Sequence, residues 1–528
     1  MARHTDSELV ARIKYFLPSK VAFEGRPPDV PFGICLFFLL AAKFYATFRF
    51  TLSSRASRNY FHHVDKGWIT EKSYKDYGDV EWIFWKQEAT EILGFMLART
   101  ALRQLLRGFS RLSDVLLALD LIACTALLGV NAVTFHLALT GIFFVVALAR
   151  VRLLIWALAA VLCFARYALP MDALFDEGDM WDHFRFECTA CFLVARCISF
   201  GFDYVDILDA SVDERPLQTL LSFIKYNFFY PCFMVGPIIP YNTFCEKLKT
   251  PRITTNKQLF GLVGKVFGAL AVYEVGGHIH YPFSTRYDQR YAQTTDLWSL
   301  VGNSFALGRF FFYKYVVLYG TAGFFTIING IDYAQLPICT SWCHRYSLMW
   351  QWFDHGLYVF LKQYIYIPFA EKNVGKVFSS MGCFAFISVW HGFSKHITCW
   401  IVMNWSLLLL EGLVYKHIKH QHLQAIFNSP IIVLCILSNM FFLGENYNFG
   451  FQLLNRLIIR NSATGIGTML FIGYCWSFTG EYFRTWKKHY TYPKVKTSKA
   501  PVLPTVDKAG GDATFATENQ SKESLKAE

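Results

Sequence analysis

The chain has 528 residues, of which 54% are hydrophobic, 18% aromatic and only 17% charged, with a formal net charge of +12. This composition excludes an ordinary soluble enzyme, because soluble domains carry about 25% charged residues. The positive charge is spread over the segments between apolar runs. Such a distribution is typical of topology signals and of contact with anionic membrane lipids, so no nucleic-acid partner is expected.

Repeated apolar runs have the length needed to cross a bilayer, which is roughly 17–25 residues for ~30 Å of hydrocarbon. In chain order we predict helical spans over 32–49, 88–106, 114–130, 131–149, 151–169, 188–205, 258–277, 298–320, 347–369, 377–393, 397–415, 429–444 and 464–483. No cleavable secretory signal precedes the first run, so we expect that run to remain as an anchor. The expected fold class is all-α, a polytopic transmembrane bundle with a central catalytic cavity.

Three regions of the chain differ in character. Residues 32–484 form the predicted multi-span membrane domain, with about ten to thirteen spans and re-entrant pieces. Residues 1–31 are predicted to be a cytosolic segment. Residues 485–528 are rich in Lys, Pro, Thr, Ser, Ala, Gly and Glu, so we expect a disordered cytosolic tail.

The apolar region 219–242 is predicted to be re-entrant and not a span. It contains three prolines and a glycine between residues 230 and 240, which break the helical hydrogen-bond ladder. Broken backbone at membrane depth is tolerated only where protein or a water-filled cavity satisfies it. Such a segment is expected to line a pathway.

Lysine and arginine beside the apolar runs predict the orientation of the chain, because segments rich in these residues stay in the cytosol. The residues placed in the cytosol by this rule are Arg99, Arg103, Arg107, Arg111, Arg150, Arg152, Lys247, Lys249, Arg252, Lys257, Lys416, Lys419, Arg484, Lys487, Lys488, Lys494, Lys496 and Lys499. The acidic loop 172–182 and the His391 end of its helix then fall on the luminal side. One stretch conflicts with the rule, since it is luminal if 32–49 crosses: Arg49, Arg55, Arg58, Lys66, Lys72 and Lys75.

Two ionisable residues lie in apolar, aromatic surroundings and are candidate catalytic groups. His391 follows Phe-Ile-Ser-Val-Trp (386–390), and Asp354 follows Met-Trp-Gln-Trp-Phe (349–353). Ionisable groups at membrane depth are costly and typically functional. His391 could accept a proton from a nucleophile, which suits acyl transfer, and Asp354 needs a partner such as His355, His391 or substrate. The structural alternatives are an interfacial histidine at a helix end and an aspartate that bonds a helix end.

The order and spacing of these residues resemble the membrane-bound O-acyltransferases, in particular the hedgehog acyltransferase branch. The resemblance spans about residues 30–483 and includes Asp-Val-Glu-Trp-Ile-Phe-Trp (79–85), Phe-Phe-Tyr-Pro (228–231), Met-Trp-Gln-Trp-Phe-Asp (349–354), Tyr-Ile-Tyr-Ile-Pro (364–368), Val-Trp-His-Gly (389–392), Asn-Trp (404–405) and Phe-Leu-Gly-Glu-Asn (442–446). Gln351 and Phe393 depart from relatives that carry a basic residue and a small residue there. These departures bear on the acceptor and the acyl chain more than on the reaction.

The resemblance implies an enzyme of the endoplasmic reticulum membrane, with the Golgi as the other compartment. Palmitoyl-CoA is the implied co-substrate, and the implied acceptor is the N-terminal cysteine of a secreted protein of hedgehog type. His391 matches the catalytic histidine and Asp354 the catalytic aspartate, while Trp350 and Asn446 match substrate-binding positions. A thioester donor requires no catalytic metal.

The fourteen cysteines form no visible disulfide framework. Cys188 and Cys191 have metal-site spacing but no second pair, so metal binding there is not favoured. Cys339 resembles the position from which hedgehog-type members ligate a haem b iron through thiolate. A plain loop cysteine and a palmitoylation site are the alternatives.

Two other functions are compatible with these residues. A lipid O-acyltransferase of the same superfamily would use a similar histidine on a lysophospholipid or sterol. A non-catalytic transporter or trafficking protein would use the buried polar groups for passage or assembly. Transfer assays with a His391→Ala variant separate all three.

Overall fold

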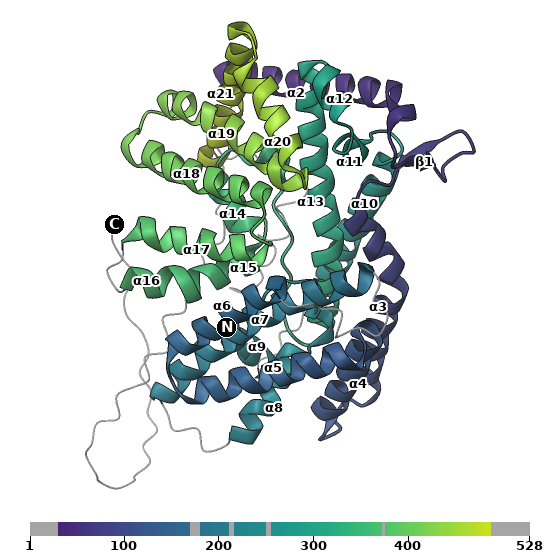
Figure 1. The fold of residues 1–528 in the computed structure, drawn as a ribbon, viewed down its shortest axis with the longest axis vertical. Helices are drawn as coiled ribbons and strands as arrows, with labels where there is room; N and C mark the ends of the chain where they lie inside the picture. The colour runs from purple at the N-terminus through teal and green to yellow at the C-terminus, as the bar shows by residue number, and fades with distance from the viewer. Residues whose placement is uncertain (1–29, 169–179, 211–215, 250–254, 372–374, 487–528) are drawn as a thin grey trace, which may run out of the picture. The chain divides into compact units, whose positions relative to one another are not determined.

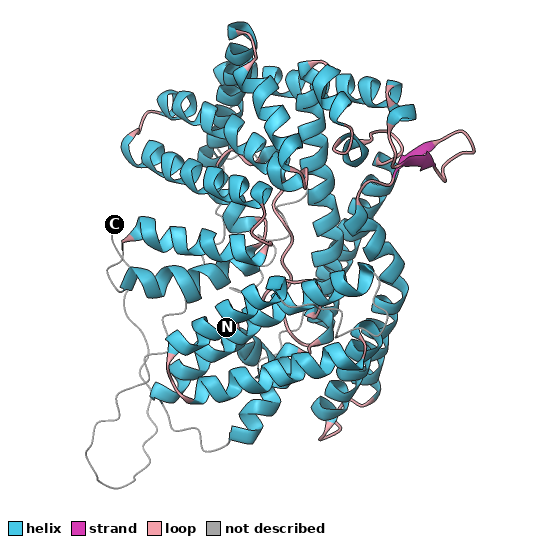
Figure 2. Cartoon of the chain, in the orientation of Figure 1, coloured by secondary structure: helices cyan, strands magenta, loops and turns pink. Residues whose placement is uncertain are grey.

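The computed structural model describes residues 30–168, 180–210, 216–249, 255–371 and 375–486, and these residues are almost entirely helical (Figures 1 and 2). This confirms the all-α prediction. The predicted terminal segments, 1–31 and 485–528, lie almost wholly outside the described residues, so their boundaries stay predictions.

The long helices coincide with the predicted apolar runs. They are α2 (Val30–Ala56), α3 (Val80–Leu105), α4 (Leu112–Leu128), α5 (Val130–Leu148), α6 (Arg152–Ala168), α7 (Met180–Ala210), α10 (Asn256–Gly276), α13 (Leu297–Ile328), α17 (Lys376–Trp390), α18 (Lys395–His417), α19 (Gln421–Leu443) and α21 (Ala463–Trp486). Seven are long and apolar enough to cross a membrane: α2, α5, α7, α10, α13, α18 and α19. The chain is a multi-pass membrane protein.

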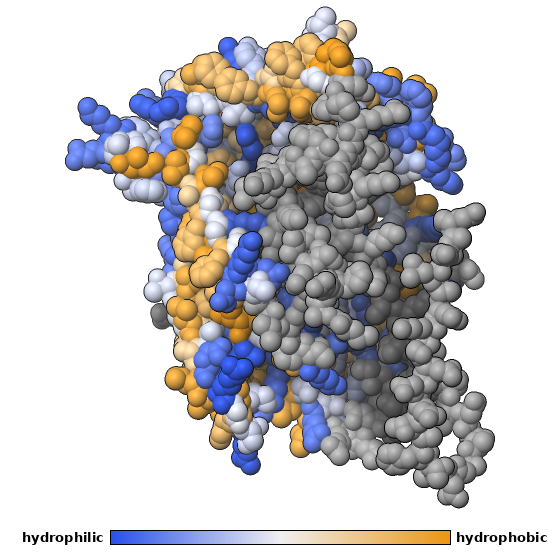
Figure 3. Space-filling model, turned by 180° about the vertical axis from the view of Figure 1, so that it is seen from behind, coloured by the Kyte–Doolittle hydropathy of each residue, from blue (hydrophilic) through white to orange (hydrophobic). Residues whose placement is uncertain are grey.

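Several of these helices leave large apolar side chains exposed. Phe37 and Phe44 of α2 are 66% and 74% exposed, and Phe260 of α10 is 75% exposed. In water such side chains would be unfavourable, whereas lipid solvates them. In Figure 3 apolar residues, in orange, gather along the left and the top of the view. The outward faces of α2 and α10 therefore border the bilayer.

A small polar layer joins the ends of α2, α3, α10 and α13. It comprises β1 (Val64–Lys66), which pairs antiparallel with β2 (Tyr74–Asp76), together with α11 (Pro282–Thr285) and α12 (Gln289–Thr294). Asp76 anchors the hairpin, because its carboxylate accepts the Phe283 N–H at 2.8 Å and the Ser284 hydroxyl at 2.5 Å. Burial raises the pKa of Asp76 to about 6, and these hydrogen bonds oppose that shift.

No long helix forms over residues 219–242, as predicted. The chain folds into α8 (Pro216–Asn227), a 3₁₀ turn η3 (Tyr230–Cys232) and α9 (Tyr241–Lys249). Arg196 of α7 is 3% exposed and donates to the carbonyl oxygens of Asn227, at 2.9 Å, and Cys232. The Tyr226 hydroxyl donates to the Ile239 carbonyl at 2.6 Å. Protein groups thus satisfy the carbonyls that the broken helix leaves free.

The predicted single span over 347–369 is wrong. This part of the chain forms α14 (Tyr346–Trp352), α15 (His355–Leu361), a π-helical turn η5 (Lys362–Tyr366) and α16 (Ile367–Glu371). The break falls at Asp354, whose side chain accepts the Leu357 N–H and starts a new helix. At Gly356 the chain passes so close to Ile238 that a Cβ would lie 2.6 Å from the Ile238 carbonyl oxygen. The Asp354 cap and the close approach of Gly356 to Ile238 therefore interrupt the single helix that the apolar run predicts.

The two ends of α2 lie at different places in the fold. At its N-terminal end, Phe32 packs on Tyr482 and Phe483 of α21, with ring centroids 4.5 and 5.1 Å apart. At the other end, Arg49 forms an ion pair with Asp296 at 3.0 Å. A helix of 27 residues is about 40 Å long, enough to cross a membrane. The basic stretch 49–75, which conflicts with the charge rule, therefore begins at the opposite end of α2 from the C-terminal end of α21.

Candidate active site

A cavity of about 680 Å³ lies among α3, α7, α13, α14, α15, α17 and α19. This volume falls within the ~300–1,000 Å³ range typical of ligand sites. Its lining includes three of the predicted site residues, His391, Asp354 and Trp350. The broken segment that contains α14 and α15 thus brings its polar groups into the interior of the helical domain.

α13 supplies one wall of the cavity through a single helical face. Its cavity-lining residues are Ser304, Phe305, Gly308, Phe311, Tyr315 and Tyr319. Apart from the adjacent pair Ser304 and Phe305, they are three or four positions apart, which places them on one side of an α-helix. The opposite sides of α13 pack against α2 and α10 (Figure 1). One continuous helix therefore carries both tyrosine hydroxyls of this wall.

His391 caps the C-terminus of α17 and lies in the cavity wall. Its backbone N–H donates to the Ile387 carbonyl at 3.0 Å, and the following Gly392 has a φ of 105°, which turns the chain toward α18. The imidazole lies edge-on to Phe442 and Trp400, with ring centroids 5.2 and 5.7 Å away. The aromatic surroundings orient the ring and leave it exposed to the cavity.

Asp354 is held at two points. Its carboxylate accepts the Leu357 N–H at 2.9 Å and the Tyr319 hydroxyl at 2.7 Å. Tyr319 is therefore the protein partner that sequence reasoning looked for in His355 or His391. His355 instead stacks on Trp352 and bonds to the Gln351 carbonyl at 2.9 Å. Asp354 combines the role of a helix cap with a place in the cavity wall.

The two predicted substrate-binding residues lie in different surroundings. Trp350 lines the cavity, stacks on Trp400 with a centroid separation of 5.6 Å and donates its indole N–H to Asn404 at 3.3 Å. Asn446 is exposed, starts α20 (Tyr447–Leu454) by accepting the Asn448 N–H at 2.8 Å, and is not among the described residues that line the cavity. An unpredicted asparagine, Asn439, lines the cavity instead.

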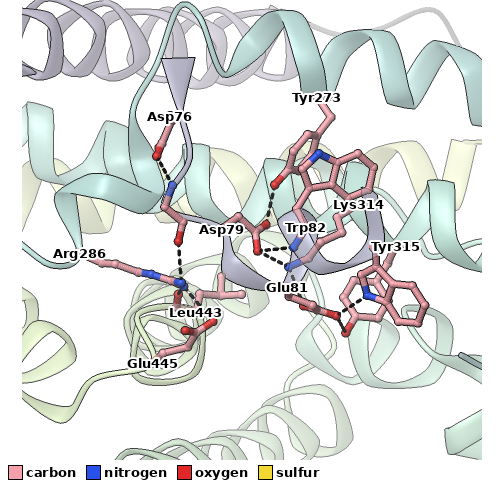
Figure 4. A network of polar contacts seen from close by, with 12 residues as sticks. Asp76, Asp79, Glu81, Trp82, Tyr273, Arg286, Lys314, Tyr315, Leu443 and Glu445 are labelled. Carbon is pink, nitrogen blue, oxygen red and sulfur yellow. Dashed lines mark hydrogen bonds and ion pairs between the residues drawn. The ribbon is translucent and has the colours of Figure 1, made fainter. Parts of the chain in front are cut away.

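The charges of the cavity wall have one sign. The described lining residues include the carboxylates of Glu81, Glu187, Asp354 and Glu445, and none of them is a lysine or arginine. Figure 4 shows how Arg286 lies beside Leu443 and Glu445, to which it bonds at 3.1 and 2.9 Å. The positive charge of Arg286, which is not a lining residue, partly neutralises the carboxylate of Glu445. The cavity itself favours cationic or neutral ligand groups over anionic ones.

A second, smaller cavity of about 180 Å³ adjoins the first. The two share Ser304, Phe305, Ile432, Ile436 and Trp476 as lining residues. The wall of the second cavity also contains Lys43, whose ammonium lies 3.8 Å from the centre of the Trp476 ring and donates to the Ser341 carbonyl. Most of this lobe is apolar, which suits a hydrocarbon chain.

The cysteines show no metal centre. No group of three or more His, Cys, Asp or Glu in the described ranges could hold a metal ion. Cys188 and Cys191 line the larger cavity, whereas Cys339 lines neither of the two cavities. An iron ligand needs open space for the porphyrin beside its sulfur. The two cavities give no support for a haem at Cys339, and no step below involves one.

Sequence reasoning assigned no role to four polar residues around the cavity, namely Glu81, Lys314, Tyr315 and Tyr319. A signal for one of them was present, because Lys314 is a charged residue inside the apolar run 298–320. The tyrosines carried no such signal, since aromatic residues are abundant throughout the chain.

Part of the amino-acid sequence matches a known family of membrane enzymes. Residues 208–454 match the model of MBOAT, the membrane-bound O-acyltransferase family. Over these residues the chain is similar to that family of membrane-bound acyltransferases, and its long apolar helices make it a multi-pass membrane protein.

The resemblance to the hedgehog-type branch is also confirmed. The chain is 25% identical to protein-cysteine N-palmitoyltransferase HHAT of Mus musculus, over 76% of the chain and 87% of the relative. It is 26% identical to protein-cysteine N-palmitoyltransferase Rasp of Drosophila melanogaster, over 67% and 74%. It is 25% identical to membrane-bound O-acyltransferase GUP2 of Saccharomyces cerevisiae, over 41% and 35%.

Proposed function

We propose that this protein transfers a palmitoyl group from palmitoyl-CoA to the N-terminal cysteine of a secreted signalling protein of hedgehog type, in the endoplasmic reticulum membrane. The observation that carries the proposal is the presence of His391 and Asp354 in the wall of one cavity. The names of the mouse and fly relatives support a cysteine acceptor. His391 and Asp354 are the proposed catalytic residues.

The reaction needs one proton acceptor and no metal. The amine nitrogen of the acceptor attacks the thioester carbonyl carbon, a C–N bond forms, and the C–S bond breaks. His391 takes the proton that the amine loses and passes it to the departing thiolate, which leaves as coenzyme A thiol. Asp354, fixed by Tyr319 and the Leu357 N–H, positions the acceptor beside His391.

The two cavities fit the two parts of the donor differently. The apolar lobe behind Phe305 and Trp476 suits the acyl chain. The phosphates of coenzyme A stay outside the larger cavity, because its carboxylates would repel them. The same repulsion disfavours an anionic lysophospholipid acceptor. Trp350 would contact the donor within the larger cavity.

The proposed function is tested with labelled palmitoyl-CoA and a short peptide that begins with cysteine, in membranes that carry wild type or His391→Ala. We expect label on the peptide with wild type and a loss of about a hundredfold or more in the variant, which is the usual effect of removing a general base. His396→Ala is the matched control, because His396 lies near His391 in the chain but outside the cavity lining.

Three results would contradict the proposal. Undiminished transfer in His391→Ala would remove His391 from the mechanism. Label in the lipid extract and none on the peptide would show a lipid O-acyltransferase. No label in either fraction, with a normally expressed protein, would favour a transporter or trafficking role.

A further inference from the structure

A buried charge cluster lies behind the cavity, at the junction of α3 and α13. Lys314 of α13 is 4% exposed and forms ion pairs with Asp79 at 3.0 Å and Glu81 at 2.6 Å. Figure 4 shows the lysine between the two carboxylates. One positive charge thus faces two negative charges, so the cluster keeps a net charge of −1.

The two carboxylates of the cluster differ in what surrounds them. Asp79 is 5% exposed, and its oxygens accept from Lys314, the Trp82 N–H at 3.2 Å and the Tyr273 hydroxyl at 2.5 Å. These bonds turn Asp79 away from the cavity. It is a structural partner of Lys314 and the N-cap of α3.

Glu81 faces the cavity. Its side chain is 24% exposed and belongs to the cavity lining. One oxygen accepts from the Tyr315 hydroxyl at 3.2 Å and from the Trp85 indole at 3.4 Å, and the other accepts from Lys314. A carboxylate offers about four acceptor positions. Glu81 therefore has acceptor capacity left for a ligand.

Glu81 lines the same cavity as Asp354, one of the proposed catalytic residues. Tyr315, which bonds to Glu81, and Tyr319, which bonds to Asp354, lie one turn apart on α13, with ring centroids separated by 5.2 Å. The two carboxylates are thus held on the same wall by neighbouring tyrosines. No lysine or arginine is among the described lining residues, so within the cavity neither side chain would compete with a cationic ligand, and Lys314 pairs with Glu81 from behind the wall.

We infer that Glu81 is the binding residue for the α-ammonium group of the acceptor, and that the Lys314 and Tyr315 contacts fix its carboxylate for that purpose. The inference rests on the proposed function for the identity of the acceptor. The N-terminal amine has an ordinary pKa of about 7.7–8.0, so it arrives mostly protonated at neutral pH. Glu81 captures the ammonium, which releases one proton to water before the neutral amine moves to His391 and attacks. The second proton, lost by the attacking nitrogen, is the one that His391 passes to the thiolate.

The test measures binding without the donor, so that it does not depend on transfer. Two fluorescent peptides are compared, one that begins with cysteine and one that begins with a 3-mercaptopropionyl group, which is the same residue without its amine. We expect wild type to bind the cysteine peptide about tenfold more tightly or better, as for a charge-assisted hydrogen bond. In Glu81→Gln the two affinities are expected to become equal.

Steady-state kinetics provide a second readout. Glu81→Gln should raise the KM for the cysteine peptide by about tenfold or more and leave the KM for palmitoyl-CoA unchanged. A purely structural defect would lower the amount of active enzyme without this split. Glu91→Gln is the matched control, because Glu91 lies exposed on the same helix outside the cavity lining.

The outcomes separate this inference from the proposed function. Discrimination between the two peptides that persists in Glu81→Gln overturns the inference, and so does a wild type that binds both peptides equally. If Glu81→Gln does not fold, the wild-type comparison alone still decides whether the amine is recognised. Amine-dependent binding in a protein that transfers no palmitate would support the inference while the proposed function fails.

Discussion

Lys314 shows how one buried residue couples stability to the site. It is 4% exposed in the middle of α13 and neutralises part of the charge of Asp79 and Glu81. A buried ion pair adds little when it replaces good apolar packing, but removal of one partner leaves charge without compensation. Loss of Lys314 is therefore expected to destabilise the protein mainly because Asp79 and Glu81 would keep their negative charges without a positive partner.

Replacement of Lys314 by Met should destabilise the protein by about 3–5 kcal/mol, because buried Asp79 and its neighbour Glu81 would lose their shared positive partner. The measurement is the midpoint of thermal denaturation in detergent. Lys86→Met is the control, since Lys86 is 47% exposed and its contact with Glu274 at 3.4 Å should contribute less than about 1 kcal/mol. Equal midpoints for the two variants would show that the cluster carries no stability of this size.

At the scale of single elements, α13 is the helix on which the site is built. Six of its residues line the cavity, and two of its glycines differ in their surroundings. At Gly302 a Cβ would overlap the Ala46 carbonyl oxygen of α2, so this glycine permits close helix packing. At Gly308 a Cβ would meet nothing within 4 Å, and the position lines the cavity.

Gly308→Phe should therefore fold normally and fill part of the cavity. Gly308 lies one turn from Ser304, which lines both cavities, so the phenyl ring should obstruct a long acyl chain more than a short one. We expect the ratio of palmitoyl to octanoyl transfer to fall by about tenfold or more. Gly264→Phe, on the exposed side of α10 with equally open surroundings, should keep the wild-type ratio. An unchanged ratio in Gly308→Phe would place the acyl chain elsewhere.

At the scale of the whole molecule, the basic residues after α2 required an explanation, because the charge rule places such residues in the cytosol. Two of them have acidic partners within the fold: Arg49 pairs with Asp296 at 3.0 Å, and Lys75 pairs with Glu274. Pairing reduces the net positive charge of this layer. The layer also lies at the opposite end of α2 from the end of α21.

An epitope inserted between β1 and β2 and an epitope at the C-terminus should therefore lie on opposite sides of the membrane. In sealed vesicles with the cytosolic face outward, added protease should remove the C-terminal epitope and leave the hairpin epitope intact. Detergent should expose both epitopes, which is the control for cleavage. Loss of both epitopes in intact vesicles would contradict the crossing of α2.

Much of the fold followed from local properties of the chain. Apolar runs of membrane length located the long helices, although some predicted ends differ from the observed ends by eight residues, and the prolines of 230–240 predicted the break there. The prediction failed over 347–369, where hydropathy does not reveal that Asp354 caps a new helix or that Gly356 packs on Ile238. The cap is local but has no hydropathy signal, and the approach of Gly356 to Ile238 joins segments more than a hundred residues apart.

The sequence by itself determined that this is a helical membrane protein with buried ionisable residues, because hydropathy and the cost of charge in lipid act locally along the chain. It also singled out His391, Asp354 and Trp350, which the fold brings into one cavity wall. Only the tertiary structure decided which groups surround them. The Tyr319 bond to Asp354, the exposed position of Asn446 and the pairing of Glu81 with Lys314 depend on how α3, α13, α15 and α20 pack in space. Such long-range contacts leave no periodic or compositional trace in a single chain.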